Sequence, residues 1–361
     1  MTEKVEVSGK VLTIIIPMYQ SESFIKKCLD SMVLGRTDLE KLEVLVVNDG
    51  SKDCSAALVQ EYVYRYPDTV RLINKENGGH GSAVNRGISQ CRGRFFKVVD
   101  ADDWVCTQGL AKILQTLEHQ AGRADVVLAA YRMHDIRDGN MEMVSCGRDA
   151  AGTWTGLCGV LQDWGRYRRL LTLHGLIYQT EFYRTQDLQL PEHVYYDDAY
   201  FDVVPAAHAR RIYVSDTVLY EYRIGDENQS ISRRNRETRL GELENVLFQI
   251  CETLEEGQTL SEAGKCYWYR RTASFVADYY ATALIRAENR RRGRMAARAF
   301  SNRLKQENRK LWRMSRLKYF VLFFMHVIRL KEEHLQALFR IRERAGFGYR
   351  GKKSSRKSNS R

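Results

Sequence analysis

Short apolar, β-branched runs alternate with helical segments between residues 11 and 99, and this alternation limits the possible folds more than any other feature. Val11 to Pro17 is a continuous apolar run ended by proline, which is typical of a strand buried on both faces of a parallel sheet. Ser21 to Leu34 follows with apolar residues at helical spacing and a serine that can cap the helix. The repeated unit predicts an α/β fold with a mostly parallel sheet, right-handed crossovers and helices on both faces. The expected strands cover residues 11–17, 42–47, 70–73 and 95–99, and the expected helices cover residues 21–34, 53–66 and 81–91.

Three carboxylates follow the fourth expected strand. Residues 95–104, FFKVVDADDW, place Asp100, Asp102 and Asp103 within four positions. Carboxylates at this density repel one another unless a cation lies between them, which indicates a divalent metal held by oxygen ligands. Mg2+ or Mn2+ in such sites usually completes its shell with water and substrate phosphates, so a diphosphate ligand is predicted. The alternative is an acidic turn in which Asp103 or Thr107 caps the next helix.

The ends of the other strands carry residues that suit a nucleotide. Ligands bind beyond the carboxyl ends of the strands in such sheets, and Pro17 to Tyr19, Asp49 and the acidic cluster all fall there. Tyr19 can offer a ring face to a base, and Asp49 can accept an N–H from a base edge. Residues 77–81, NGGHG, form a glycine-rich loop that can approach an anion, although such loops are also common without a ligand. No Walker lysine pattern and no G-x-G-x-x-G follow the first strand, which argues against an NTPase or a dinucleotide enzyme.

Four motifs occur in one order: IPMY at 16–19, VNDGSKD at 47–53, ENGGHGSAVN at 76–85 and VDADDW at 99–104. Together they resemble the family 2 inverting glycosyltransferases, which have the Rossmann-like GT-A fold. The resemblance implies a nucleotide-diphosphate sugar donor, UDP-linked as the first expectation, and Mg2+ or Mn2+ as the cofactor. It also implies donor-binding roles for Pro17, Tyr19, Glu22, Asp49, Asn77, Gly78, Gly79, Asp100 and Asp102, and metal-binding roles for Asp102 and Asp103.

A second acidic motif lies further along the chain, at residues 195–201, YYDDAYF. Asp197 and Asp198 resemble the acidic pair that supplies the general base in the same family, although the family more often has Glu-Asp here. Such a pair fits an inverting displacement, because a carboxylate must take the proton of the acceptor hydroxyl. We assign the base to Asp198 and keep Asp197 as the second choice. Judged alone, the pair would more simply be read as the acidic start of a helix. A lone histidine, His174, could contact the donor diphosphate or the acceptor, but is more often structural.

Residues 211–214 and 217–222 are expected to form two further strands. Tyr222-Arg223 and the Ser-Ile-Ser at 230–232 resemble the stretch that closes the catalytic domain in non-processive family members, and the Q-x-x-R-W motif of processive synthases is absent. One sugar per encounter is therefore expected. The acceptor implied by the resemblance is a surface polysaccharide or a lipid-linked glycan.

From Arg236 onward, long proline-free stretches predict helices. Residues 301–361 contain 18 Lys or Arg against 4 Glu, a balance of +14, so the net charge of +12 comes from this end and the rest of the chain is slightly negative. The apolar part at 319–328 is shorter than the ~20 residues needed to span a bilayer. The segment can pack on the catalytic domain, lie on an anionic membrane through residues 311–361, or do both at once. The expected divisions are a tail at 1–10, a catalytic domain at 11–232 (donor side 11–105, acceptor side 106–232), a helical region at 233–345 and a basic tail at 346–361.

Eight scattered cysteines and a polar start without an apolar core favour a cytoplasmic protein, with peripheral contact at the inner face of the cell membrane. The alternative from another class is a nucleic-acid-binding protein, because the isoelectric point is near 9.3. The basic charge is separated from the motifs, however, and no specific nucleic-acid partner is expected. A sugar nucleotidyltransferase is the other alternative, but it should carry a glycine-rich basic loop after the first strand, where residues 17–22 have neither glycine nor lysine.

Overall fold

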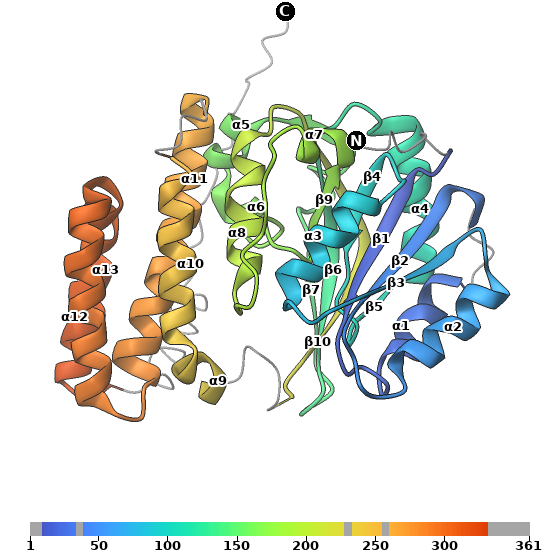
Figure 1. Ribbon diagram of the computed structural model, residues 1–361. Coiled ribbons are helices and arrows are strands. Elements are labelled where there is room, and N and C mark those ends of the chain that lie inside the picture. Colours follow the sequence, from blue (N-terminus) through green and yellow to red (C-terminus); the bar gives the residue numbers. More distant parts are fainter. Residues whose placement is uncertain (1–8, 34–38, 227–232, 255–259, 331–361) are drawn as a thin grey trace, which may run out of the picture.

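The computed structural model describes residues 9–33, 39–226, 233–254 and 260–330 (Figure 1). Its strands are β1 (Leu12–Met18), β2 (Leu42–Asp49), β3 (Val70–Lys75), β4 (Phe95–Val98), β5 (Trp104–Val105), β6 (Val126–Asp135), β7 (Met141–Val144), β8 (Thr153–Thr155), β9 (Leu176–Gln179) and β10 (Ile212–Ile224). They form one sheet in the order β3-β2-β1-β4-β9-β6-β10-β5, with β7 beside β6 and β8 beside β10. Strands β1 to β4, β6 and β10 run in one direction, and β5, β7, β8 and β9 run in the other. The predicted α/β class with mostly parallel strands is confirmed.

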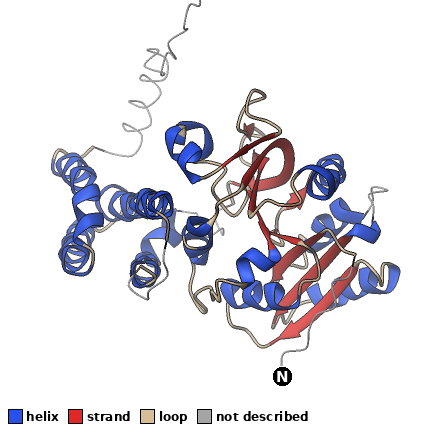
Figure 2. Ribbon diagram, turned by 90° about the horizontal axis from the view of Figure 1, so that it is seen from above, coloured by secondary structure: helices blue, strands red, loops and turns tan. Residues whose placement is uncertain are grey.

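The first four strands are separated by helices that lie against both faces of the sheet (Figure 2). Every residue of β1 and β2 is buried, as the continuous apolar runs predicted. Their carboxyl ends share one edge, since Met18 pairs with Asn48 and Asn48 pairs with Asn74. The helices of this part are α1 (Ile25–Val33), η1 (Leu39–Lys41), α2 (Ser55–Arg65) and α3 (His80–Gln90).

The last strand, β10, differs from expectation. Two separate strands were predicted at 211–214 and 217–222, but the chain forms one strand from Ile212 to Ile224. Its pairing with β6 shifts register between Val214 and Tyr220, so the polar residues at 215–217 interrupt the apolar pattern without ending the strand. The strand therefore carries Tyr220 and Tyr222 to the same edge as the acidic cluster.

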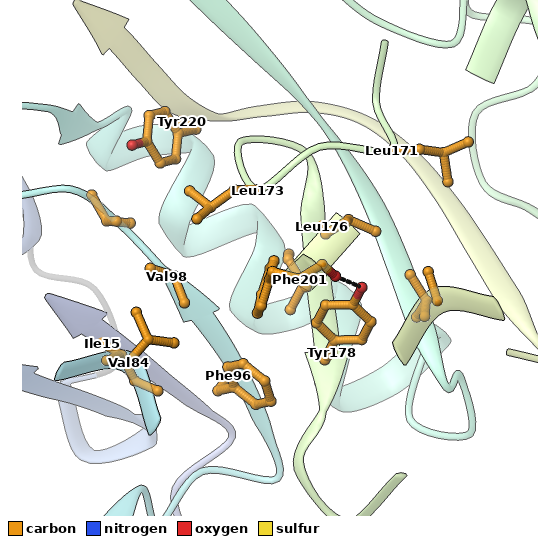
Figure 3. Close-up of a cluster of buried hydrophobic side chains, with 14 of the residues drawn as sticks. Ile15, Val84, Phe96, Val98, Leu171, Leu173, Leu176, Tyr178, Phe201 and Tyr220 are labelled. Carbon is orange, nitrogen blue, oxygen red and sulfur yellow. Dashed lines mark hydrogen bonds between the residues drawn. The ribbon is translucent and has the colours of Figure 1, made fainter. Parts of the chain in front are cut away.

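A short helix, α8 (Asp197–Val203), begins with the acidic pair. Tyr196 before it has a left-handed backbone, with φ at 71°, which turns the chain into the helix. Behind the helix lies an aromatic cluster in which the rings of Phe201 and Phe96 pack on Tyr178, at centroid distances of 5.0 and 5.8 Å (Figure 3). The other elements of the middle part are α4 (Thr107–Gln115), η2 (Thr116–Gln120), α5 (Leu157–Gln162), α6 (Trp164–Tyr167), α7 (Thr180–Arg184) and η3 (Pro205–His208).

The described residues after 232 are helical, as predicted, and they lie to one side of the sheet (Figures 1 and 2). These elements are α9 (Arg233–Thr238), α10 (Leu240–Glu252), α11 (Glu262–Ala281), η4 (Thr282–Arg286), α12 (Arg290–Glu307) and α13 (Arg309–Val327). Helices α10 and α11 pack against α8, while α13 packs on α11, α12 and η4. One core of buried side chains continues from β1 to Leu311. Among the described residues, no helix is both long and apolar enough to span a bilayer.

Candidate active site

The turn after β1 contains the first group of predicted donor-binding residues. Glu22 Oε2 accepts the Cys54 backbone N–H at 3.0 Å, and the Glu22 N–H donates to Asp53 Oδ2 at 3.2 Å. Glu22 therefore joins the turn after β1 to the turn after β2. Tyr19 is 48% exposed, so its ring is accessible to a ligand, whereas Pro17 is buried within β1.

Asp49, at the end of β2, holds the glycine-rich loop. Its Oδ1 accepts the Gly78 N–H at 2.9 Å and the Lys75 ammonium at 2.7 Å, and its Oδ2 accepts the Gly79 N–H at 2.8 Å. Asn77 Nδ2 donates to the Asp49 carbonyl at 2.9 Å. Three of the roughly four acceptor positions of this carboxylate are therefore occupied, and Asp49 is 2% exposed. Asp49 is thus a structural residue of the loop as well as a predicted ligand of the donor.

The acidic cluster after β4 is partly enclosed by β10. The Tyr220 hydroxyl donates to Asp103 Oδ2 at 2.5 Å, and the Arg223 N–H donates to Asp103 Oδ1 at 2.7 Å. Burial, followed by the charges of Asp102 and Asp100, raises the pKa of Asp103 well above its usual value. Asp100 and Asp102 are each partly exposed, so this end of the cluster faces solvent.

The helix after the cluster does not use these acids as caps. Helix α4 begins at Thr107, and its N-cap residue, Cys106, makes no side-chain capping hydrogen bond. Thr107 Oγ1 donates instead to the Ser31 carbonyl at 2.7 Å. The capping alternative for Asp103 and Thr107 is therefore wrong.

His80, the first residue of α3, lies between the two acidic motifs. Its Nε2 is 3.0 Å from Asp100 Oδ1, and its Nδ1 is 2.7 Å from Asp197 Oδ2. Burial disfavours the charged imidazolium, but the charges and hydrogen bonds of Asp197 and Asp100 outweigh this and raise the pKa of His80 well above its usual value. A protonated His80 donates to both carboxylates, so one side chain joins the acidic cluster to the acidic pair.

The two members of the acidic pair have different surroundings. Asp197 is buried, and its Oδ2 is the partner of His80. The side chain of Asp198 is exposed, but neighbouring protein atoms displace part of its hydration shell. This desolvation, together with the charge of Asp197, raises the pKa of Asp198 to about 6. Asp198 is therefore accessible to a ligand and, near neutral pH, ionised but more basic than an ordinary aspartate.

His174 lies beside the acidic cluster. Its ring stacks on Tyr222 at 3.9 Å between centroids and meets the edge of Tyr220 at 5.0 Å. Burial, and to a smaller extent the charge of Lys97, lowers the pKa of His174 to about 4 although Asp100 opposes this shift. His174 is consequently neutral at physiological pH, so one of its ring nitrogens can act as a metal ligand.

Ligand atoms of Asp100, Asp103 and His174 all lie within 4.8 Å of one another. Carboxylate oxygens are the ligands that Mg2+ and Mn2+ prefer, and an imidazole nitrogen can complete such a set, so these residues fit either ion. The predicted metal pair was Asp102 and Asp103. The geometry brings Asp103 into the set but gathers Asp100 and His174 around it, and the role of Asp102 stays a prediction.

Residues 13–184 match the model of the family described as glycosyl transferase family 2. The chain carries a family 2 glycosyltransferase domain. All four motifs, at residues 16–104, lie within the match. The acidic pair and the helices after residue 232 lie beyond it.

Relatives of this family are found in several bacteria. The uncharacterized glycosyltransferase EpsJ of Bacillus subtilis is 28% identical over 214 residues, which cover 59% of this chain and 61% of EpsJ. The uncharacterized glycosyltransferase YibD of Escherichia coli is 27% identical over 244 residues, covering 64% of this chain and 65% of YibD. The chain thus matches about three fifths of the length of these relatives.

Solved structures extend the likeness to the whole described fold. Residues 1–349 of Staphylococcus aureus TarS, in a crystal structure in complex with UDP-GlcNAc, superpose with a TM-score of 0.61. The identity is 20%, and the superposition covers 94% of this chain and 93% of that one. The fold of the family 2 domain is therefore the GT-A fold, followed by helices.

Two histidines of this site were not assigned by the sequence. His80 was treated only as part of a glycine-rich loop. For His174, contact with the donor diphosphate or the acceptor was considered, but a structural role was preferred. Each contacts residues far away in the chain, such as Asp197, which is 117 positions from His80. The one available signal was that a histidine stands where the loop becomes a helix, next to a strand end that also carries acids.

Proposed function

We propose that the chain transfers one sugar per encounter from a nucleotide-diphosphate sugar, UDP-linked in the first instance, to a surface-polysaccharide or lipid-linked acceptor with inversion. The observation that carries this proposal is the His80 bridge between Asp100 and Asp197. This bridge joins the acidic cluster after β4 to the acidic pair at the start of α8 in one site. A nucleotidyltransferase or a nucleic-acid-binding protein would not need an accessible base at that place.

On the donor side, Tyr19 would contact the base, Asp49 would take one base N–H, and the loop at Asn77–Gly79 would face the diphosphate. Asp100 and Asp102 would contact the ribose and the metal-bound diphosphate. The metal would be held by Asp103 together with Asp102, as the motif predicts, or with Asp100 and His174, as the geometry favours. When bound, Mg2+ or Mn2+ would neutralise charge on the leaving diphosphate.

On the acceptor side, Asp198 is the proposed base. Its carboxylate takes the proton of the acceptor hydroxyl while that oxygen bonds to the anomeric carbon from the face opposite the diphosphate. The bond between the anomeric carbon and the phosphate oxygen breaks, and its electron pair leaves with the nucleoside diphosphate. Asp198 suits this role better than Asp197, because Asp197 is buried against His80 whereas Asp198 is exposed and has a pKa of about 6.

The last described helix, α13, supports contact with a membrane at the cytoplasmic face. One side of the helix is buried at Leu311, Ser315 and Met325. It packs on α11, α12 and η4, whereas the sequence predicted packing on the catalytic domain. The other side exposes a stripe of apolar residues, and α13 contains no acidic residue. Such a stripe with basic neighbours suits an anionic membrane surface. We call it the α13 stripe; it comprises Leu317, Phe320, Val321, Phe324, Val327 and Ile328.

We further propose that the chain is divided as the sequence suggests, with the donor side at 11–105, the acceptor side at 106–232 and the helical region from 233. The strands end at Ile224 and the next described element is the helix α9, which supports this division.

A thermal-shift panel tests the proposed function. UDP, GDP, dTDP, CDP and ADP would each be added with and without Mn2+. A ligand at one hundred times its dissociation constant stabilises the fold by about 2.7 kcal/mol, which is measurable as a rise in Tm. We expect a metal-dependent rise with one base, strongest for UDP, and its loss in Asp102→Ala and Asp103→Asn. The absence of a shift with every nucleotide would contradict the proposal.

A further inference from the structure

The helix that carries the acidic pair is too short to hold its own position. Helix α8 has seven residues, Asp197 to Val203, and isolated helices of that length are unstable. Pro205 has no N–H, so it cannot donate to the Phe201 carbonyl as the fourth residue after it would in a longer helix. The end of α8 therefore depends on contacts from elsewhere in the molecule.

These contacts come from two sides. The Tyr178 hydroxyl of β9 donates to the Phe201 carbonyl at 2.9 Å (Figure 3). The Tyr267 hydroxyl of α11 donates to the Asp202 carbonyl at 2.7 Å. Both tyrosines are fully buried, so their hydroxyls have no competing solvent and hold the end of α8 between the sheet and the carboxyl-terminal helices.

A charged contact reinforces the second side. Arg271 lies one turn after Tyr267 on α11, and its Nη2 donates to Asp202 Oδ2 at 2.8 Å. Asp202 is 2% exposed, and its burial raises its pKa to about 7 although Arg271 opposes this. Since Asp202 follows Asp198 by four residues, it lies one helical turn from the proposed base. A shift of Asp202 would move Asp198 with it.

We propose that Arg271 and Tyr267 are positioning residues, which hold α8 so that Asp198 lies at the acceptor hydroxyl. The carboxyl-terminal helices are then part of the catalytic apparatus and not only an accessory to the family 2 domain. This inference rests on the proposed function, because it assigns Asp198 as the base.

The test uses the full chain in three forms: Arg271→Met, Arg271→Lys and the control Lys265→Met. Lys265 lies on the same helix, is half-exposed and pairs with Glu262 at 2.9 Å, so the control removes a cation from α11 away from α8. Three quantities are measured well below each Tm: the transfer rate at saturating donor, the Kd for UDP with Mn2+, and hydrogen exchange of the amides at 197–203.

Arg271→Met should lower the transfer rate by about ten- to a hundredfold, as expected when a catalytic group is misplaced, with the UDP affinity unchanged. Exchange at 197–203 should become faster while exchange in β1 and β2 stays the same. Arg271→Lys should recover much of the rate, and Lys265→Met should match the parent chain. A merely destabilising change would lower Tm without this separation of rate from affinity.

A transfer rate for Arg271→Met within about twofold of the parent, or unchanged exchange at 197–203, would overturn the proposal. If Arg271→Met does not fold, Tyr267→Phe provides the second test, because it removes only one hydroxyl and should change rate and exchange in the same direction. If the parent chain transfers no sugar, the proposed function fails, and the exchange comparison still decides whether α11 holds α8.

Discussion

The proposed donor side and the proposed acceptor side of this molecule are built differently. The donor side, β1 to β4, presents its residues on turns that directly follow strands, and its hydrogen bonds link neighbouring turns. The proposed acceptor side places Asp198 on a helix of seven residues. The position of this helix depends on three other elements, α3, β9 and α11, through His80, Tyr178, Tyr267 and Arg271. The residues of the proposed donor side can therefore be recognised from local sequence motifs, whereas the position of Asp198 on the proposed acceptor side depends on long-range contacts.

The largest expected effect separates the two sides. Asp198→Asn keeps the shape of the side chain but cannot accept the proton of the acceptor hydroxyl, so transfer should fall by about 10²- to 10⁴-fold. The Kd for UDP with Mn2+ should not change, because the donor side is intact. Single-turnover transfer and calorimetric titration measure the two quantities. Glu181→Gln, at an exposed position in the first turn of α7, is the matched control. An active Asp198→Asn enzyme would remove this residue from the role of base.

A smaller effect is expected where the two sides meet. His80→Asn should lower transfer by about ten- to a hundredfold, since Asp100 and Asp197 would lose their shared partner and face each other's charge. His119→Asn is the control, because His119 is exposed on η2. If both variants transfer equally well, the bridge has no part in catalysis and the two sides act independently.

The pH dependence of transfer reports on Asp198 itself. The base must be ionised, and its pKa is raised to about 6, so kcat/KM should fall about tenfold per pH unit below pH 6 and be level between pH 7 and 8. Circular dichroism at each pH confirms that the chain stays folded. A profile that remains flat down to pH 5 would show that Asp198 has an ordinary pKa or is not the base.

The sequence predicted the strands and turns of the proposed donor side, because each of these elements has a local cause. The buried strands were visible as apolar runs, and the turns carried Asp49 and the Asp100–Asp103 cluster at the expected edge. It could not reveal the His80–Asp197 or Asp202–Arg271 contacts, since these join residues 117 and 69 positions apart. His174 illustrates the same limit, because only the fold brings it beside Asp100 and Asp103. Strand β10 was divided in two because a register shift interrupts its pattern.

The smallest effect on catalysis is expected at the α13 stripe. The double variant Phe320→Ser and Phe324→Ser should reduce flotation with phosphatidylglycerol vesicles at least tenfold, because each buried phenyl ring contributes about 2 kcal/mol. Transfer to a water-soluble acceptor should not change. Met295→Ser, an exposed apolar position on α12, is the control. Equal flotation of the double variant and the control would exclude the stripe as the membrane contact.

The most direct measurement is a crystal structure of the complex with UDP and Mn2+, with anomalous diffraction to locate the metal. We expect Mn2+ within bonding distance of Asp103 and the diphosphate between the acidic cluster and the glycine-rich loop. The Asp198 carboxylate should face the side from which an acceptor attacks. A nucleotide bound elsewhere, or a metal with no contact to the residues from Asp100 to Asp103, would contradict the claim that the acidic cluster and the acidic pair form one active site.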